Sequence, residues 1–261
     1  MSTTTLAAPI RVNHSGVHAR PGLARLVAVE LRKMLNTRAG FWLQVATVAI
    51  TVVAVIARAV TGDAADHTFA GVLDVGLQPA AVLLPVTGIL LVTSEWSQRT
   101  GMITFALVPV RSRVVGAKLI AGLTFALGMV ATSVAVAAGG VLVASAGVAG
   151  AWADAAPLIG QSAVYLTTGM IVGVAFGMVV LASTPAITAL FALPIAWTIV
   201  ASLSFFADVA PWLDTRLALD PLPAEVLDAT QWAHAGTALA LWMLLPLLIG
   251  AWRITRREVA A

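Results

Sequence analysis

Long runs of apolar residues, separated by short polar segments, dominate the chain from residue 39 onward. Because a bilayer core needs about 20 apolar residues in a helix, a run of that length without charge predicts a transmembrane span. Five stretches reach or approach this length without any Asp, Glu, Lys or Arg: Ala39–Ala57, Val75–Ser94, Leu119–Ala153, Ala155–Ala207 and Ala229–Trp252.

Two of these stretches are longer than one span requires. Ala155–Ala207 has 53 residues, which suits two helices, and Ser183-Thr184-Pro185 is the natural break because proline favours the first turn of a new helix. Leu119–Ala153 has 35 residues and forms either one long tilted helix or two short helices broken near Gly139-Gly140. With one helix there, we predict six spans, at about 41–60, 76–94, 117–147, 157–181, 185–206 and 232–252.

The distribution of charge favours six spans over seven. Six spans place 13 Lys/Arg and 3 acids on one side, and 2 Lys/Arg and 9 acids on the other. Cytoplasmic segments carry the excess of basic residues, so both termini are predicted to be cytoplasmic in a bacterial cytoplasmic membrane. Composition agrees, since 60% of residues are hydrophobic and only 10% are charged, against roughly a quarter in soluble domains. The fold class is therefore an all-α polytopic membrane protein.

The segments before the first span predict a tail and a surface helix. Residues 1–20 are polar and without periodicity, so we expect a disordered cytoplasmic tail, and no signal peptide is recognisable there. Residues 21–40 alternate apolar and basic positions at helical spacing, which predicts an amphipathic interfacial helix carrying Glu30, Arg32 and Lys33. The alternative is a cytoplasmic extension of the first span.

The loop between the second and third spans is the largest on the cytoplasmic side. It runs from 95 to 118 and contains a polar start, a short apolar run at 102–108, Pro109 and three cations. Seven residues are too few to span a membrane, so this run predicts a short helix that rests on the membrane or docks into a groove of another protein. An ordinary connector remains the alternative. On the opposite side, residues 207–233 combine acids, leucines and two tryptophans, which suits a loop that dips into the membrane edge.

The chemistry of an energy source is absent from the sequence. There is no phosphate-binding G-x-x-x-x-G-K-[ST] loop, no G-x-S-x-G and no H-E-x-x-H motif, and the chain has no cysteine. The predicted spans hold almost no ionisable group, which argues against coupling to a proton or sodium gradient. We therefore predict no enzyme activity, no metal and no cofactor in this chain, and no nucleic acid among its partners. Gly169, Gly173 and Gly177 form a small-residue stripe that packs helices within the chain or at a dimer seam.

The layout resembles the permease subunit of ABC-2-type transporters, especially the small bacterial six-span exporters. The resemblance covers nearly the whole chain beyond residue 20 and rests on VELRKMLNTRAGFWL before the first span, TSEWSQRTGMITFALVPVRSRVVGAKL after the second, and the terminal GAWRITRRE. The residues matching the family pattern in the second segment are Glu95, Trp96, Arg99, Thr100, Pro109, Arg111 and Lys118.

This resemblance implies a machine with several subunits. The permease would dimerise with a second copy or a homologue, and it would dock on a separate ABC ATP-binding subunit that holds ATP and Mg. The loop carrying Glu95, Trp96, Arg99, Thr100, Pro109 and Arg111 would form the coupling helix, and residues 207–233 a partial re-entrant gate. The expected cargo is a drug, antibiotic, peptide or lipid-like compound, which would connect the protein to antibiotic resistance. The rival hypotheses are a non-transporting scaffold or immunity protein and an intramembrane enzyme.

Overall fold

The computed structural model describes residues 22–63, 66–97, 110–145, 148–206 and 208–256. In this part of the chain every regular element is helical. The elements begin with α1 (Leu23–Asn36), α2 (Arg38–Thr61), α3 (Phe69–Ser97), α5 (Arg111–Ala144), α6 (Ala155–Val180) and α7 (Ser183–Ala201). The remainder are η2 (Ser204–Phe206), α8 (Ala210–Leu213), α9 (Thr215–Leu219), α10 (Ala229–Leu239), η3 (Ala240–Leu244) and α11 (Leu245–Arg256).

Six helices in the described residues are long and apolar enough to cross a membrane, which agrees with the predicted number of spans. They are α2, α3 up to Trp96, α5, α6, α7 and the continuous rod formed by α10, η3 and α11. A single helix, α5, covers most of the 35-residue apolar stretch and runs through Gly139 and Gly140 without a break. The predicted break between the fourth and fifth spans is also present, since α6 ends at Val180 and α7 begins at Ser183.

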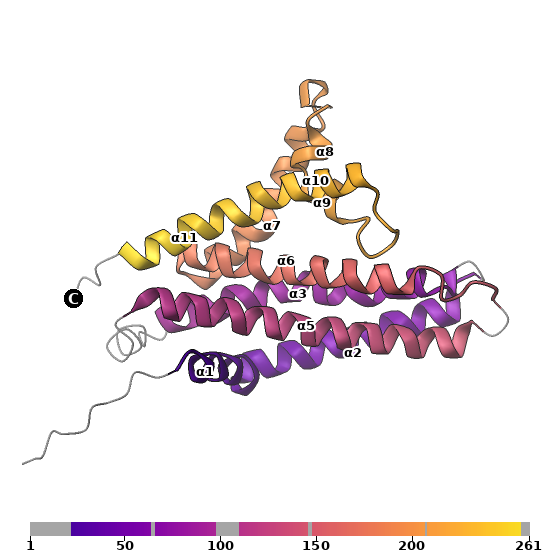
Figure 1. The fold of residues 1–261 in the computed structure, drawn as a ribbon, viewed down its shortest axis with the longest axis horizontal. Helices are drawn as coiled ribbons and strands as arrows, with labels where there is room; N and C mark the ends of the chain where they lie inside the picture. Colours follow the sequence, from indigo (N-terminus) through magenta and orange to yellow (C-terminus); the bar gives the residue numbers. More distant parts are fainter. Residues whose placement is uncertain (1–21, 64–65, 98–109, 146–147, 207, 257–261) are drawn as a thin grey trace, which may run out of the picture.

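Four helices form the centre of the molecule. Helices α2, α3, α5 and α6 run side by side along the long axis, while α7 inclines away from them (Figure 1). The largest fully buried side chains come mainly from α3 and α6 and include Leu73, Leu77, Leu84, Leu166 and Met170. The outer helices remain apolar on their exposed sides, with Val53, Ile195 and Ile199 each more than 60% exposed. An apolar exposed belt of this kind is what lipid requires.

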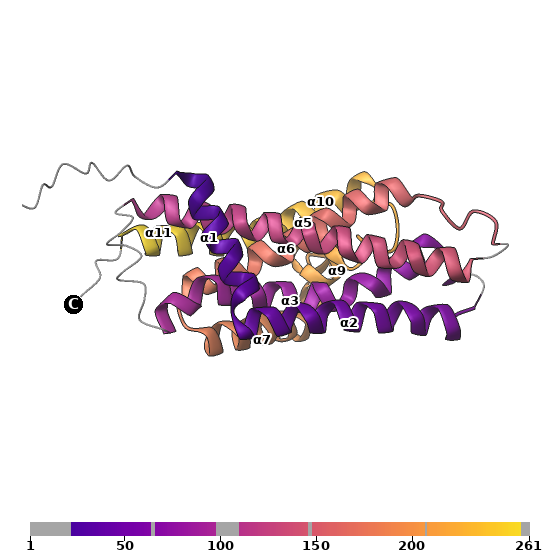
Figure 2. The same ribbon diagram turned by 90° about the horizontal axis from the view of Figure 1, so that it is seen from below.

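Helix α1 lies across one end of this bundle and is not a continuation of α2 (Figure 2). The two are separated at Thr37, whose extended backbone (ψ 143°) ends α1 and whose side chain accepts a hydrogen bond from the N–H of Gly40. The end of α11 reaches the same end of the bundle as α1 (Figure 1), and Arg111 at the start of α5 donates to the carbonyl oxygen of Ile254 there. An even number of spans requires this placement of the two chain ends.

The last span contains a local irregularity with a clear cause. Pro246 lacks an N–H, and in a regular α-helix its ring would clash with the carbonyl group of Trp242, four residues earlier. The chain widens into a π-helical turn over η3, directly before this proline, which relieves the clash. Helices α10 and α11 therefore continue as one span around the proline.

Candidate functional site

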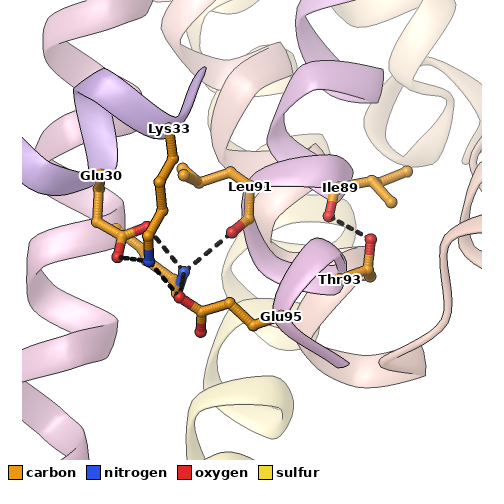
Figure 3. Close-up of polar contacts among 7 residues, drawn as sticks. Glu30, Lys33, Ile89, Leu91, Thr93 and Glu95 are labelled. Atoms are coloured by element: carbon orange, nitrogen blue, oxygen red, sulfur yellow. Dashed lines mark hydrogen bonds and ion pairs between the residues drawn. The ribbon is translucent and has the colours of Figure 1, made fainter. Parts of the chain in front are cut away.

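A compact group of charged side chains joins three helices at the end of the bundle that carries α1. Helix α1 supplies Glu30 and Lys33, the last turn of α3 supplies Glu95, and the start of α5 supplies Lys118. We call these four residues the ion cluster (Figure 3). Lys33 and Lys118 are the only lysines in the chain, so every lysine is placed in this cluster.

The contacts within the ion cluster form a closed ring. Lys33 Nζ lies 2.9 Å from Glu30 Oε1 and 2.6 Å from Glu95 Oε1. Lys118 Nζ lies 2.8 Å from Glu30 Oε2 and 3.2 Å from Glu95 Oε1. Each carboxylate therefore contacts both ammonium groups, and the four charges sum to zero. Lys118 also donates to the carbonyl oxygen of Leu91 at 3.0 Å, which anchors α5 to the backbone of α3.

Most of the ion cluster is buried, so its charges need partners within the protein. The side chains of Glu30, Glu95 and Lys118 are only 6–7% exposed, whereas Lys33 reaches the surface. Burial alone would lower the pKa of Lys33, but its hydrogen bonds to Glu95 and Glu30 and their negative charges outweigh that effect and raise this pKa above its ordinary value. Buried charges are stable only while each keeps its partner, so the ion cluster fixes α1, α3 and α5 relative to one another.

The position of the ion cluster also marks one edge of the membrane. Asp74 and Glu95 are the acidic residues nearest the two ends of α3, and 21 residues separate them. At 1.5 Å per residue this separation is about 32 Å, close to the roughly 30 Å thickness of a hydrocarbon core. This spacing is what a helix crossing the core requires if the ion cluster lies near one boundary and Asp74 near the other.

The residues predicted to dock on an ATP-binding subunit have different surroundings in the structure. Glu95 is buried in the ion cluster, Trp96 packs partly buried against the apolar core, and Arg111 donates to the backbone of α11. Arg99, Thr100 and Pro109 lie outside the described residues. Of the interfacial-helix residues, Glu30 and Lys33 turn toward the bundle, while Arg32 is exposed. The described members thus connect helices of one chain, and their docking role stays a prediction.

The glycine stripe of α6 faces α3. A Cβ atom on Gly173 would overlap the carbonyl group of Pro85, and one on Gly177 would come within 3.1–3.2 Å of Val92 and Ile89. Gly169 lies beside the ring of Pro85 as well. The stripe therefore allows close packing of two helices within this chain, which was one of the two predicted alternatives, and nothing in it bears on a dimer seam.

A second polar feature holds the segment between α7 and α10 against the bundle. The side-chain amide of Gln161 donates to the carbonyl oxygens of Leu222 (2.8 Å) and Glu225 (2.6 Å), and its oxygen accepts from the N–H of Leu227 (2.9 Å). Trp242 Nε1 donates to the carbonyl oxygen of Leu213. Residues 208–233 are thereby bound to α6 and η3, and the helices α8 and α9 among them fold back between α7 and α10 (Figure 1).

A cavity of about 240 Å³ lies between α3, α6, α7, α9 and η3. Its wall is apolar and aromatic, with polar groups contributed by α6 and α9. The lining residues used below are Pro85, Tyr165, Phe176, Phe191, Arg216, Asp220 and Trp242. Pro85 stands 11 residues from Asp74 along α3, so part of this cavity is about 16 Å from that membrane boundary. The cavity therefore lies at membrane depth.

Sequence reasoning missed the partners that these sites require. Lys118 matches the family pattern but was not assigned to a site, and nothing in the sequence pattern singles out Gln161. One signal for Lys118 was present in the composition, because only two of the 15 basic residues are lysines. In the described part of the chain, no group of three or more His, Asp or Glu side chains is arranged to hold a metal ion.

The functional assignment rests on the residues described above, because comparison with known proteins adds nothing to it. No protein-family model matches the chain, and no curated protein matches it.

Proposed function

We propose that this protein is the membrane-spanning permease subunit of an ATP-driven ABC exporter, working with a second permease copy or homologue and a separate ATP-binding subunit. The observation that supports this proposal best is the ion cluster. It ties together α1, the end of α3 and the start of α5, which are the helix before the first span and the two helices that flank residues 98–109.

A rigid connection of this kind suits a part that receives force from another subunit. A displacement of residues 98–109 reaches α3 and α5 directly, and the ion cluster makes α1 move with them because separating its charges leaves buried groups unpaired. Helix α3 then packs along α6 through the glycine stripe, so the displacement continues into the centre of the bundle. The chain itself carries no nucleotide-binding motif, so ATP and Mg belong to the partner subunit.

The same arrangement supports a surface position for α1. Its axis lies across the bundle (Figure 2), and it exposes Arg25 and Arg32 together with Leu23 and Leu35. Exposed cations beside exposed leucines are typical of a helix lying in the headgroup region of a membrane. We place this end in the cytoplasm, following the excess of basic residues.

The test is to purify the tagged chain from its native membrane and to identify co-purifying P-loop ATPases by mass spectrometry. An ATPase in stoichiometric amount, with ATP hydrolysis in the purified complex, is the expected result. Arg99→Glu should weaken the association, because it reverses a charge in the predicted coupling segment. Asp63→Lys is the control, since it changes charge by the same amount at an exposed site at the far end of α2.

Absence of any ATPase would favour a scaffold or immunity protein instead. An ATPase that associates equally well with Arg99→Glu and with the unaltered chain would show that the coupling segment has been assigned wrongly. Glu95→Lys is unsuitable here, because it would introduce a third positive charge into the buried ion cluster and disturb folding.

A further inference from the structure

One acidic and one basic side chain, Asp220 and Arg216, line the cavity between α3, α6, α7, α9 and η3. They form an ion pair of 3.3 Å between Arg216 Nε and Asp220 Oδ2. Partial burial raises the pKa of Asp220 and Arg216 lowers it, while the negative charges of Asp214 and Asp74, which lie near Asp220 but outside the lining, raise it, so that the net change is an increase. The surroundings of Asp220 therefore hold more negative than positive charge.

The wall of the cavity suits a cation as well. Four aromatic side chains line it, namely Tyr165, Phe176, Phe191 and Trp242. Aromatic faces attract organic cations, and sites for quaternary ammonium groups commonly combine several aromatic rings with a carboxylate. An anion is favoured less by this wall, because the faces of aromatic rings carry negative charge density and repel it.

The depth of the cavity indicates how a charged ligand could reach it. Arg216 and Asp220 have side chains that are 75% and 58% exposed, and they line the same cavity as Pro85 near the middle of α3. Charged groups at membrane depth are costly in contact with lipid and usually face water or protein. The face of α9 that bears them is therefore a place where water, and with it a hydrophilic head group, can approach an apolar wall.

We propose that this cavity is a binding site for a small amphiphilic organic cation, whose charged head lies beside Asp220 and whose apolar part lies against the aromatic wall. The volume of about 240 Å³ is below the roughly 300–1,000 Å³ of drug-sized pockets, so the part enclosed corresponds to about one aromatic ring and its head group. As a statement about cargo this inference rests on the proposed function; as a statement about binding it does not.

The test uses the purified full-length chain in nanodiscs without any ATPase. The probe is radiolabelled phenyltrimethylammonium, whose charge does not depend on pH, and empty nanodiscs give the background. We expect saturable binding of about one probe per chain, against which the uncharged isostere tert-butylbenzene competes poorly. Asp220→Asn should weaken binding at least about fivefold, because it removes the nearest counter-charge. Asp154→Asn is the control at an exposed carboxylate that does not line the cavity, and it should leave binding unchanged.

A further variant guards against effects of misfolding. Arg216→Gln removes the competing guanidinium, so it should strengthen binding of the cation, a gain that a damaged protein cannot produce. Phe191→Leu keeps the wall apolar but removes one aromatic face, so binding of the cation should weaken more than binding of the isostere. Binding no greater than in empty nanodiscs, equal competition by the isostere, or a loss of affinity in Arg216→Gln would each overturn the inference. Because no ATPase is present, binding by a chain that fails to recruit an ATPase would reject the proposed function and retain the site.

Discussion

Removing one carboxylate from the ion cluster should destabilise the protein more than its small change in volume would suggest. In Glu30→Gln the side chain keeps its shape, but Lys33 and Lys118 are left to share Glu95. Lys118 is 6% exposed and has no route to water, whereas Lys33 is 39% exposed and can turn outward. Breaking a buried ion pair costs about 3–5 kcal/mol. Because Lys33 can turn toward solvent, we expect Glu30→Gln to lower the free energy of unfolding by about 3 kcal/mol, the lower end of this range.

The expected change is measurable as thermal unfolding in detergent, followed by the fluorescence of the eight tryptophans. In a domain of this size 1 kcal/mol shifts the melting temperature by roughly 2–4 °C, so Glu30→Gln should melt about 6–12 °C lower. Glu225→Gln is the matched control, because Glu225 is exposed and a glutamine there can still accept the hydrogen bond from Gln231. It should differ from the unaltered protein by less than about 0.5 kcal/mol.

A double variant distinguishes paired charges from ordinary packing. Glu30→Gln with Lys118→Met removes one charge of each sign and leaves Lys33 beside Glu95, so the cluster is neutral again. The two changes should therefore cost about 0.5–3 kcal/mol less together than the sum of the separate costs. Strict additivity, or a Glu30→Gln variant as stable as Glu225→Gln, would refute the argument that these buried charges depend on one another.

The other predictions concern the glycine stripe, the loop clamp and the cavity. Gly173→Ala should lower the melting temperature markedly because its Cβ would overlap the carbonyl group of Pro85, whereas Gly128→Ala on α5, with open space around it, should be neutral or stabilising by up to about 1 kcal/mol. Gln161→Leu removes three hydrogen bonds to residues 222–227, so hydrogen–deuterium exchange should rise in that segment while α5 stays unchanged. Binding of phenyltrimethylammonium should weaken as the pH falls through the pKa of Asp220; because partial burial raises that pKa, the loss should begin at a higher pH than for an aspartate of ordinary pKa, and Asp220→Asn should abolish this dependence on pH.

The spans were predictable because the signal for them is local. Uncharged length locates five stretches, and Ser183-Thr184-Pro185 divides the longest of them at the break between α6 and α7, where Leu181 adopts a left-handed conformation (φ 61°). Hydropathy alone did not decide whether α5 is continuous, since Gly139 and Gly140 are compatible with either a break or a continuous helix; the charge distribution favoured one helix, and the structure agrees. Gly140 is accommodated because its missing side chain leaves room for Val55 and Val72. That close approach involves helices distant in the sequence.

The candidate sites depend on contacts between distant segments, and these were the part that sequence reasoning could not supply. Charge patterns identify Glu30 and Lys33 as polar positions on α1, but a helix at the membrane surface predicts that they face headgroups or solvent. The burial of Glu30 follows from Lys118, 88 residues away, which contacts Glu30 and completes the ring. In the same way, the clamp of Gln161 on residues 222–227 joins two segments more than 60 residues apart.

The ion cluster also bears on the order in which the chain is assembled during synthesis. Glu30, Lys33 and Glu95 precede α5, so three of the four members are made before Lys118. Lys118 then adds contacts to both carboxylates and a hydrogen bond to the backbone of α3 at Leu91. The junction of α1, α3 and α5 is therefore completed only once residue 118 has been made.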